Sequence, residues 1–293
     1  MALSLAEFKK MSQSKLIAAV FQTFLDEAPI LRYLQFDSIP GGAVTFNRQK
    51  TLPETGFREI GSPYVTAAGE LEQVTEELKI VGGKVTLDRA LPILQGPGRF
   101  IAEQQMQLIS QARTVNAAFF KGDGTGGSFT GLQLRATNLT DNGDAALSLA
   151  NLDAAILNCK GSNKVIFMNK QMYLRLNAAA KDADLGSQVT ITPDQYGMPI
   201  TRYAGIPVVT AGEDYNGDEV LDFTETGTTT SIYIVSFDAN GMIGVENGGV
   251  REFSPVKEDL ASEFDIEWYV NYIIGNPAAV QRVMGITNAA IVA

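Results

Sequence analysis

The chain has 293 residues, a net charge of −10 and 45% hydrophobic residues, which is enough apolar material for about two globular domains. It contains no histidine, so the commonest general base and the commonest zinc ligand are missing, and no Ser-His-Asp or Cys-His catalytic set can form within one chain. Cys159 is the only cysteine, so an internal disulfide is excluded. The net negative charge, with no cluster of Lys and Arg, argues against a nucleic-acid-binding module.

The N-terminal segment is predicted to be a helix that ends before Pro29, with Ser4 and Glu7 as a possible capping box. Its apolar face packs either on the same subunit or, as an arm, on a neighbouring one. The segment lacks the basic lead and long apolar stretch of a secretory signal, and no apolar run approaches the ~20 residues that span a bilayer. We therefore expect the cytoplasm of the producing cell and no membrane partner.

Residues 41–90 are predicted to form a long two-stranded ribbon. One strand alternates through Val44, Phe46 and Arg48, and a second strand-like run covers 78–87, with Gly82-Gly83 in its middle. The intervening residues are rich in Gly and Pro and predict an irregular tip. Because a lone ribbon is only marginally stable in water, it should lie on this subunit or on the next one.

The strongest helix prediction covers residues 98–121, where apolar residues recur at helical spacing without an interior Gly or Pro. Such a helix is a rod of about 35 Å and suits a structural spine. The glycine-rich run 122–127 resembles a phosphate-binding loop, but it follows a helix instead of a strand and lacks the Lys-Ser or Lys-Thr of that motif. A glycine-rich helix stop and turn accounts for it better.

From residue 146 onward, helices and strands alternate, so the fold class is predicted to be mixed α+β. Helices are expected at 148–157 and, after a cap at Asn169, through Leu176. Strands are expected at 164–168, 199–202, 206–210, 231–236, 242–245 and 265–274. The turn Asp238-Ala-Asn-Gly241 predicts that the strands before and after it form a hairpin.

An acidic segment in this half has the spacing of a calcium-binding loop. The matching oxygen ligands would come from Asp214, Asn216, Asp218, Asp222 and Glu225, with the Val220 carbonyl at position seven. Position six should be Gly and is Glu219, and the flanks are strand-like where a helix pair is expected. An acidic surface hairpin explains the same residues without a metal, and no cofactor is predicted.

Several ordered segments together resemble the major capsid protein of tailed bacteriophages, with the Hong-Kong-ninety-seven-type coat fold. Each motif alone is weak, but their order and spacing along nearly the whole chain are fairly specific. The segments are Ala28-Pro-Ile-Leu-Arg-Tyr-Leu-Gln-Phe36, Val44-Thr-Phe-Asn-Arg-Gln-Lys-Thr-Leu-Pro53, Phe57-Arg-Glu59, 77–89, Ala118-Phe-Phe-Lys-Gly-Asp123, Phe129-Thr-Gly-Leu132, Val165-Ile-Phe-Met-Asn169, Tyr203-Ala-Gly-Ile-Pro-Val-Val209 and Glu267-Trp-Tyr269.

The resemblance implies a division of the chain into the parts of such a shell protein. It implies an N-terminal arm at 1–40, an extended loop at 41–90, and a peripheral domain at 91–145 and 255–293 that contains the spine helix 98–121. An axial domain then covers 146–254. The loop is implied to lie over a neighbouring subunit, so its partner is another copy of the chain.

The implied function is a structural, non-enzymatic subunit that assembles into hexamers and pentamers of an icosahedral capsid around double-stranded DNA. Implied partners are a separate scaffolding protein and a portal, with a decoration protein as an optional addition and DNA contacted only non-specifically. Assembly would occur in the host cytoplasm and the product is the virion capsid. An encapsulin-like cargo compartment is the alternative. Expected inter-subunit contacts are Phe46, Arg48, Phe57, Arg58, Glu59, Tyr64, Glu77 and Lys79.

Some relatives crosslink a loop lysine to a neighbouring asparagine. The loop tip 61–70 contains no lysine, whereas Lys50, Lys79 and Lys84 lie on the legs of the loop. We therefore expect particles whose subunits separate in hot detergent.

Overall fold

A computed structural model describes residues 3–4, 26–88, 90, 94, 98–181, 188–193, 199–253, 257–258 and 261–292. Two sheets and a separate two-stranded ribbon make up its strands. The predicted N-terminal helix falls mostly on residues 5–25, outside the described residues. Within the described part of the chain, no helix is both long and apolar enough to cross a membrane.

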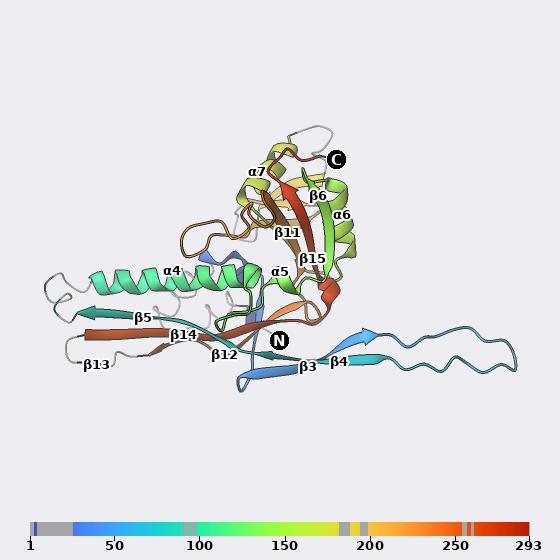
Figure 1. Ribbon diagram of the computed structural model, residues 1–293, viewed down its shortest axis with the longest axis horizontal. Coiled ribbons are helices and arrows are strands. Elements are labelled where there is room, and N and C mark those ends of the chain that lie inside the picture. The colour runs from blue at the N-terminus through green and yellow to red at the C-terminus, as the bar shows by residue number, and fades with distance from the viewer. Residues whose placement is uncertain are drawn as a thin grey trace.

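The first sheet has the order β1-β2-β12-β14-β13, and β5 also pairs with β14. The helix α4 (Gly98–Lys121) runs along β5 and β14 in Figure 1 and is the predicted spine. Its apolar residues Leu108, Val115 and Phe119 are buried against this sheet, which explains why the helical periodicity was so clear. The strands are β1 (Leu3–Ser4), β2 (Gln35–Ser38), β5 (Lys79–Asp88), β12 (Met242–Phe253), β13 (Lys257–Glu258) and β14 (Ala261–Ile274).

The second sheet stands at one end of α4 (Figure 1) and has the order β6-β15-β11-β7-β10-β9-β8. Its interior strand β11 is buried at every residue, and β7 pairs parallel with β10. The strands are β6 (Asn138–Ala145), β7 (Lys164–Met168), β8 (Val189–Pro193), β9 (Pro199–Tyr203), β10 (Ile206–Thr210), β11 (Thr229–Ser236) and β15 (Val280–Thr287).

Helices α6 (Leu149–Asn158) and α7 (Lys170–Ala179) pack on the second sheet and share a core with it. The Asn169 side chain accepts a hydrogen bond from the N–H of Gln171, which confirms the predicted cap. A larger core joins α4 and the first sheet to one face of the second. The short helical segments are η1 (Pro29–Arg32), α5 (Leu132–Arg135) and η3 (Pro277–Ala279).

The glycine-rich segment after α4 is a tight turn, as predicted. The N–H of Gly131 donates to the carbonyl of Gly122 at 2.7 Å, so the segment closes on itself. A Cβ on Gly122 would come within 2.3 Å of the Phe129 carbonyl oxygen, which explains why glycine is needed there.

The ribbon consists of β3 (Ala43–Thr51), β4 (Glu70–Glu77) and the connecting residues 52–69. The prediction that its second strand is the run 78–87 is wrong. That run is β5, which pairs with β14 in the first sheet, while the strand opposite β3 is β4. The acidic strand β4 shows no apolar alternation, so the apolar run that follows it was predicted to be the second strand of the ribbon.

The predicted hairpin around 238–241 is also wrong, although its turn is present. The N–H of Gly241 donates to the carbonyl of Asp238 at 2.9 Å. The two flanking strands nevertheless lie in different sheets, because β11 pairs with β7 and β15 whereas β12 pairs with β14 and β2. The turn therefore links the sheets.

Sheet membership also crosses the expected domain boundaries. Strand β12, within the range 146–254 assigned to the axial domain, belongs to the first sheet. Strands β6 and β15, within the ranges assigned to the peripheral domain, belong to the second sheet.

Candidate functional site

The ribbon projects away from the body on the side opposite to the free end of α4 (Figure 1). Within it, Phe46 pairs with Val74 across the two strands and Arg48 pairs with Glu72. The Arg48 Nη2 atom lies 2.6 Å from Glu72 Oε2. These cross-strand contacts give the ribbon a defined register, but two strands alone bury too little apolar surface for independent stability.

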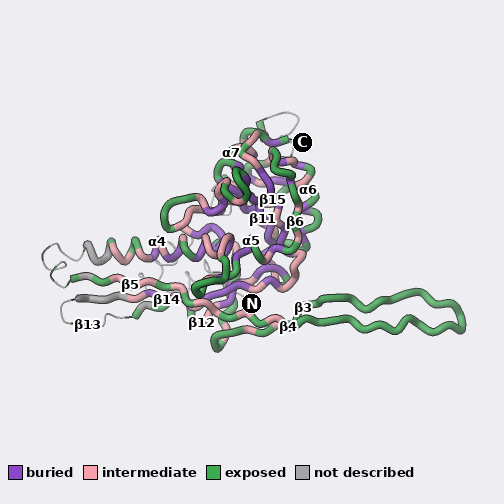
Figure 2. The backbone as a smooth tube through the Cα atoms, in the orientation of Figure 1, coloured by how far each residue is buried: buried purple, intermediate pink, exposed green. Residues whose placement is uncertain are grey.

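The tip of the ribbon exposes large apolar side chains. Phe57 and Ile60 are as exposed as in an extended peptide, at 110% and 105% of the reference area. Figure 2 shows the whole distal part of the ribbon as exposed, whereas the body contains buried segments. Arg58 lies over the Tyr64 ring with its guanidinium carbon 4.9 Å from the ring centroid. A cluster of exposed apolar residues on a projecting element is typical of a surface that another chain covers.

The predicted inter-subunit residues fall into three places on this element. Phe46 and Arg48 lie on β3, and Glu77 and Lys79 lie where the ribbon meets the body, with their charged groups 3.7 Å apart. The other four lie in the connecting segment near the tip: Phe57, Arg58, Glu59 and Tyr64.

The ribbon also exposes four apolar residues that were not predicted from the sequence as contacts: Leu52, Ile60, Val65 and Leu71. The sequence does indicate Ile60, which precedes Gly61 in a Pro- and Gly-rich segment. A large apolar residue in such a loop has no core of its own subunit to pack on, so another chain is expected to cover it. Leu71 and the rest of β4 gave a weaker signal, since four of its eight residues are glutamates.

The structure does not bring the five candidate calcium ligands together. Asp214 Oδ1 accepts the N–H groups of Asn216 and Asp218, at 2.8 and 2.9 Å, in a local turn. Asp222 pairs with Lys121 at the end of α4, and Glu225 with Arg282 on β15. Among the residues that the structure describes, no three Asp, Glu or Cys side chains are grouped as metal ligands. The calcium interpretation therefore gains no support from the geometry.

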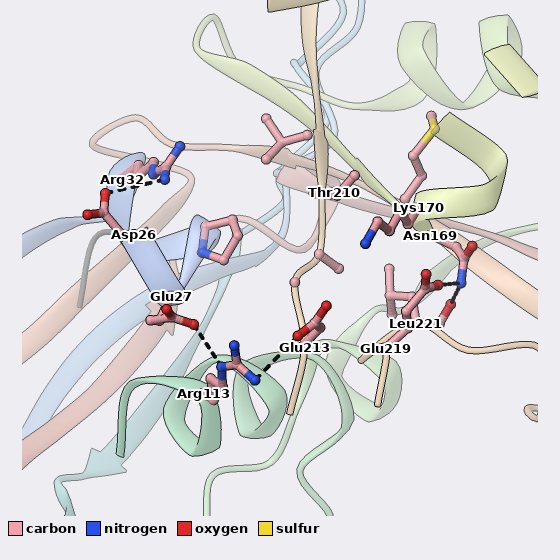
Figure 3. Close-up of a pocket in the computed structure, with 15 residues that line it drawn as sticks. Asp26, Glu27, Arg32, Arg113, Asn169, Lys170, Thr210, Glu213, Glu219 and Leu221 are labelled. Carbon is pink, nitrogen blue, oxygen red and sulfur yellow. Dashed lines mark hydrogen bonds and ion pairs between the residues drawn. The ribbon is translucent and has the colours of Figure 1, made fainter. Parts of the chain in front are cut away.

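A cavity of about 320 Å³ lies where η1, α4 and the carboxyl ends of β7 and β10 meet (Figure 3). Arg113 of α4 lies between two carboxylates, with Glu27 at 2.7 Å and Glu213 at 3.3 Å. Asn169 donates to Glu219 and to the Leu221 carbonyl. These contacts connect α4 to the segment before η1 and to the segment after β10, and they leave Arg113 and Asn169 engaged with the protein itself.

Comparison with known proteins gives matches to solved structures alone: no family model matches the sequence, and no curated protein does. The holo-SrpI encapsulin complex from Synechococcus elongatus matches with a TM-score of 0.65 at 12% identity, over 90% of this chain and 89% of the encapsulin chain. The capsid of a native GTA particle matches with a TM-score of 0.64 at 19% identity, over 87% and 88% of the two chains. The cyanophage A-1(L) capsid matches with a TM-score of 0.61 at 11% identity, over 89% and 93%.

The class of fold is thereby defined. The chain has the α+β fold of shell-forming proteins, which the sequence resemblance predicted. More particularly, it has the Hong-Kong-ninety-seven-type capsid fold found in these phage capsid structures. Each of these matches covers 87–90% of this chain, so the correspondence is not confined to one part of the fold.

Proposed function

We propose that this chain is a structural, non-enzymatic subunit of an icosahedral tailed-phage capsid that encloses double-stranded DNA. The observation that carries the proposal is the ribbon, because it exposes apolar side chains at its tip and lies away from the core of its own subunit. Each large apolar side chain that a neighbouring copy buries would contribute about 1.5–3 kcal/mol. The ribbon thus takes the role of the extended loop, and its predicted contact residues become inter-subunit contacts.

The remaining parts of the proposal follow from the same role. Hexamers and pentamers of the chain would form the shell in the host cytoplasm, with a separate scaffolding protein and a portal. A decoration protein could add to the outside, and packaged DNA would be contacted without sequence preference. The net charge of −10 disfavours tight phosphate binding, so these contacts with DNA would be weak.

Assembly of the purified chain, with and without its scaffolding partner, tests the proposal. Electron microscopy and sedimentation should show closed shells for the wild type. The double variant Phe57→Asp/Ile60→Asp should remain as free subunits or small oligomers, because two charges would replace the apolar contact. The matched control Phe57→Tyr/Ile60→Val keeps the apolar character and should still assemble. Shells formed equally well by the Asp variant would contradict the role given to the tip.

The encapsulin-like compartment is the alternative, favoured by the match of the encapsulin chain at a TM-score of 0.65. The contents of particles isolated from the native source separate the two functions. Double-stranded DNA and a portal at one vertex support the phage capsid, whereas an enclosed protein in shells without a portal supports the compartment.

A further inference from the structure

The base of the ribbon is tied to the body by an ion pair from α5. Arg135 Nη2 lies 2.5 Å from Glu76 Oε1, near the end of β4. Both side chains are largely shielded, at 16% and 20% exposed. Shielding from solvent distinguishes this pair from an ordinary exposed salt bridge, which contributes little.

The second carboxylate oxygen of Glu76 also faces a donor from the body. The Nδ2 atom of Asn271, on β14, lies 3.4 Å from Glu76 Oε2. The same atom donates a hydrogen bond to the Glu77 carbonyl at 2.6 Å. The end of β4 is therefore tied both through a side chain and through its backbone, from two different elements.

Arg135 is itself held in place by the body. Its Nη1 atom donates to the Tyr272 carbonyl at 3.1 Å, and its guanidinium carbon lies 4.4 Å from the centroid of the Tyr272 ring. Tyr272 is fully buried, and its hydroxyl donates to the Thr130 carbonyl at 2.5 Å. Arg282 adds a hydrogen bond to the Gln133 carbonyl within α5 at 3.0 Å. A guanidinium with this many fixed contacts has little freedom to follow the ribbon if the ribbon moves.

We propose that Arg135 and Asn271 are positioning residues that set the direction in which the ribbon leaves the body, and hence where its tip meets the next subunit. The inference rests on the proposed function, in which the ribbon contacts a neighbouring copy. Because the ribbon is long, a small rotation at its base moves its tip by a large distance. A nine-residue strand such as β3 spans about 30 Å at ~3.3 Å per residue, so a rotation of about 10° at the base moves its far end by about 5 Å. A displacement of that size exceeds the tolerance of a packed contact.

Glu76→Gln tests the inference, and Glu72→Gln is the matched control. Both variants remove one carboxylate charge from β4, but Glu72 pairs with Arg48 inside the ribbon and Glu76 pairs with the body. Hydrogen exchange of unassembled subunits should show at least a fivefold faster exchange at residues 76–78 in Glu76→Gln, with unchanged exchange in β11. The control should leave residues 76–78 as in the wild type.

The second measurement is the distribution of particle sizes in an assembly reaction. Glu76→Gln should give a broader distribution with more open or aberrant shells, and Glu72→Gln should give wild-type shells. Faster exchange together with wild-type particles would overturn the claim that ribbon direction controls assembly, and unchanged exchange would overturn the role of the ion pair itself. If the wild type forms no shells at all, the proposed function fails, while the exchange result still decides whether Arg135 holds the ribbon. Arg135→Gln provides a second variant for the same two readouts.

Discussion

Arg282 Nη2 lies 3.1 Å from Glu225 Oε2, and the two side chains are only 13% and 4% exposed. Ser231 also donates to Glu225 and accepts from Arg282, so the pair is embedded in a small polar network beside β11. Glu225 stands at the last position of the candidate calcium loop in the sequence, whereas in the structure this carboxylate balances a buried cation.

Removing the cation should be costly because a buried carboxylate would be left without its partner. We expect Arg282→Ala to lower the free energy of unfolding by about 3–5 kcal/mol. Denaturant unfolding of the unassembled subunit measures this change. The control is Lys50→Ala, which removes one partner of an exposed ion pair with Glu70 at 3.2 Å and should cost no more than about 1 kcal/mol. Equal effects of the two substitutions would contradict the assignment.

Two phenylalanines with opposite environments provide a second prediction. Phe119 of α4 is fully buried, and its ring centroid lies 4.9 Å from those of both Phe129 and Tyr272. Phe119→Ala should therefore lower the free energy of unfolding by about 3–5 kcal/mol. Phe57→Ala, at the exposed tip of the ribbon, should leave the melting temperature of the unassembled subunit unchanged while weakening assembly. A clear loss of subunit stability in Phe57→Ala would show that the tip packs on its own subunit.

Adjacent glycines in β5 should differ in their tolerance of a side chain. A Cβ on Gly82 would lie 2.5 Å from the Ile266 carbonyl oxygen, a backbone atom of the paired strand. A Cβ on Gly83 would meet the end of the flexible Gln107 side chain, which can move aside. We expect Gly82→Ala to cost about 1–3 kcal/mol in unfolding free energy and Gly83→Ala to be close to neutral. The opposite order in denaturant unfolding would contradict this view of the strand contact.

Local sequence signals predicted the elements well where one face is buried. The spine helix has its predicted bounds, and the strands at 164–168 and 206–210 have theirs, because burial against a core imposes a clear apolar pattern. Asn169 was found as a helix cap because capping depends on neighbouring residues alone.

Strand pairing was harder to predict because it depends on residues far apart in the chain. The acidic strand β4 has solvent on both faces for most of its length, so its sequence carries no alternation to reveal it. Phe46 therefore had no visible partner at Val74, and the apolar run of β5 was taken as the second strand of the ribbon. The contact between Arg135 and Glu76, separated by 59 positions, left no signal in the sequence either.

The buried thiol of Cys159 predicts a loss of stability at high pH. Cys159 is 2% exposed, its Sγ lies 3.3 Å from the Ala279 carbonyl oxygen, and burial raises the pKa of the thiol to about 11 from the ordinary value of 9.0. The unfolded chain loses this proton more readily than the folded one. The contribution of the neutral, buried thiol to the free energy of unfolding is therefore fully present below about pH 9. It is lost as the pH rises through about 11, and its full size is about 2–3 kcal/mol.

The difference in unfolding free energy between the wild type and Cys159→Ala should therefore be constant up to about pH 8.5 and then fall. Taking this difference removes the contribution of the tyrosines, which titrate in both proteins. A difference that stays flat from pH 8 to 11 would show that the thiol is accessible, and rapid alkylation of the folded wild type at pH 8 would show the same independently.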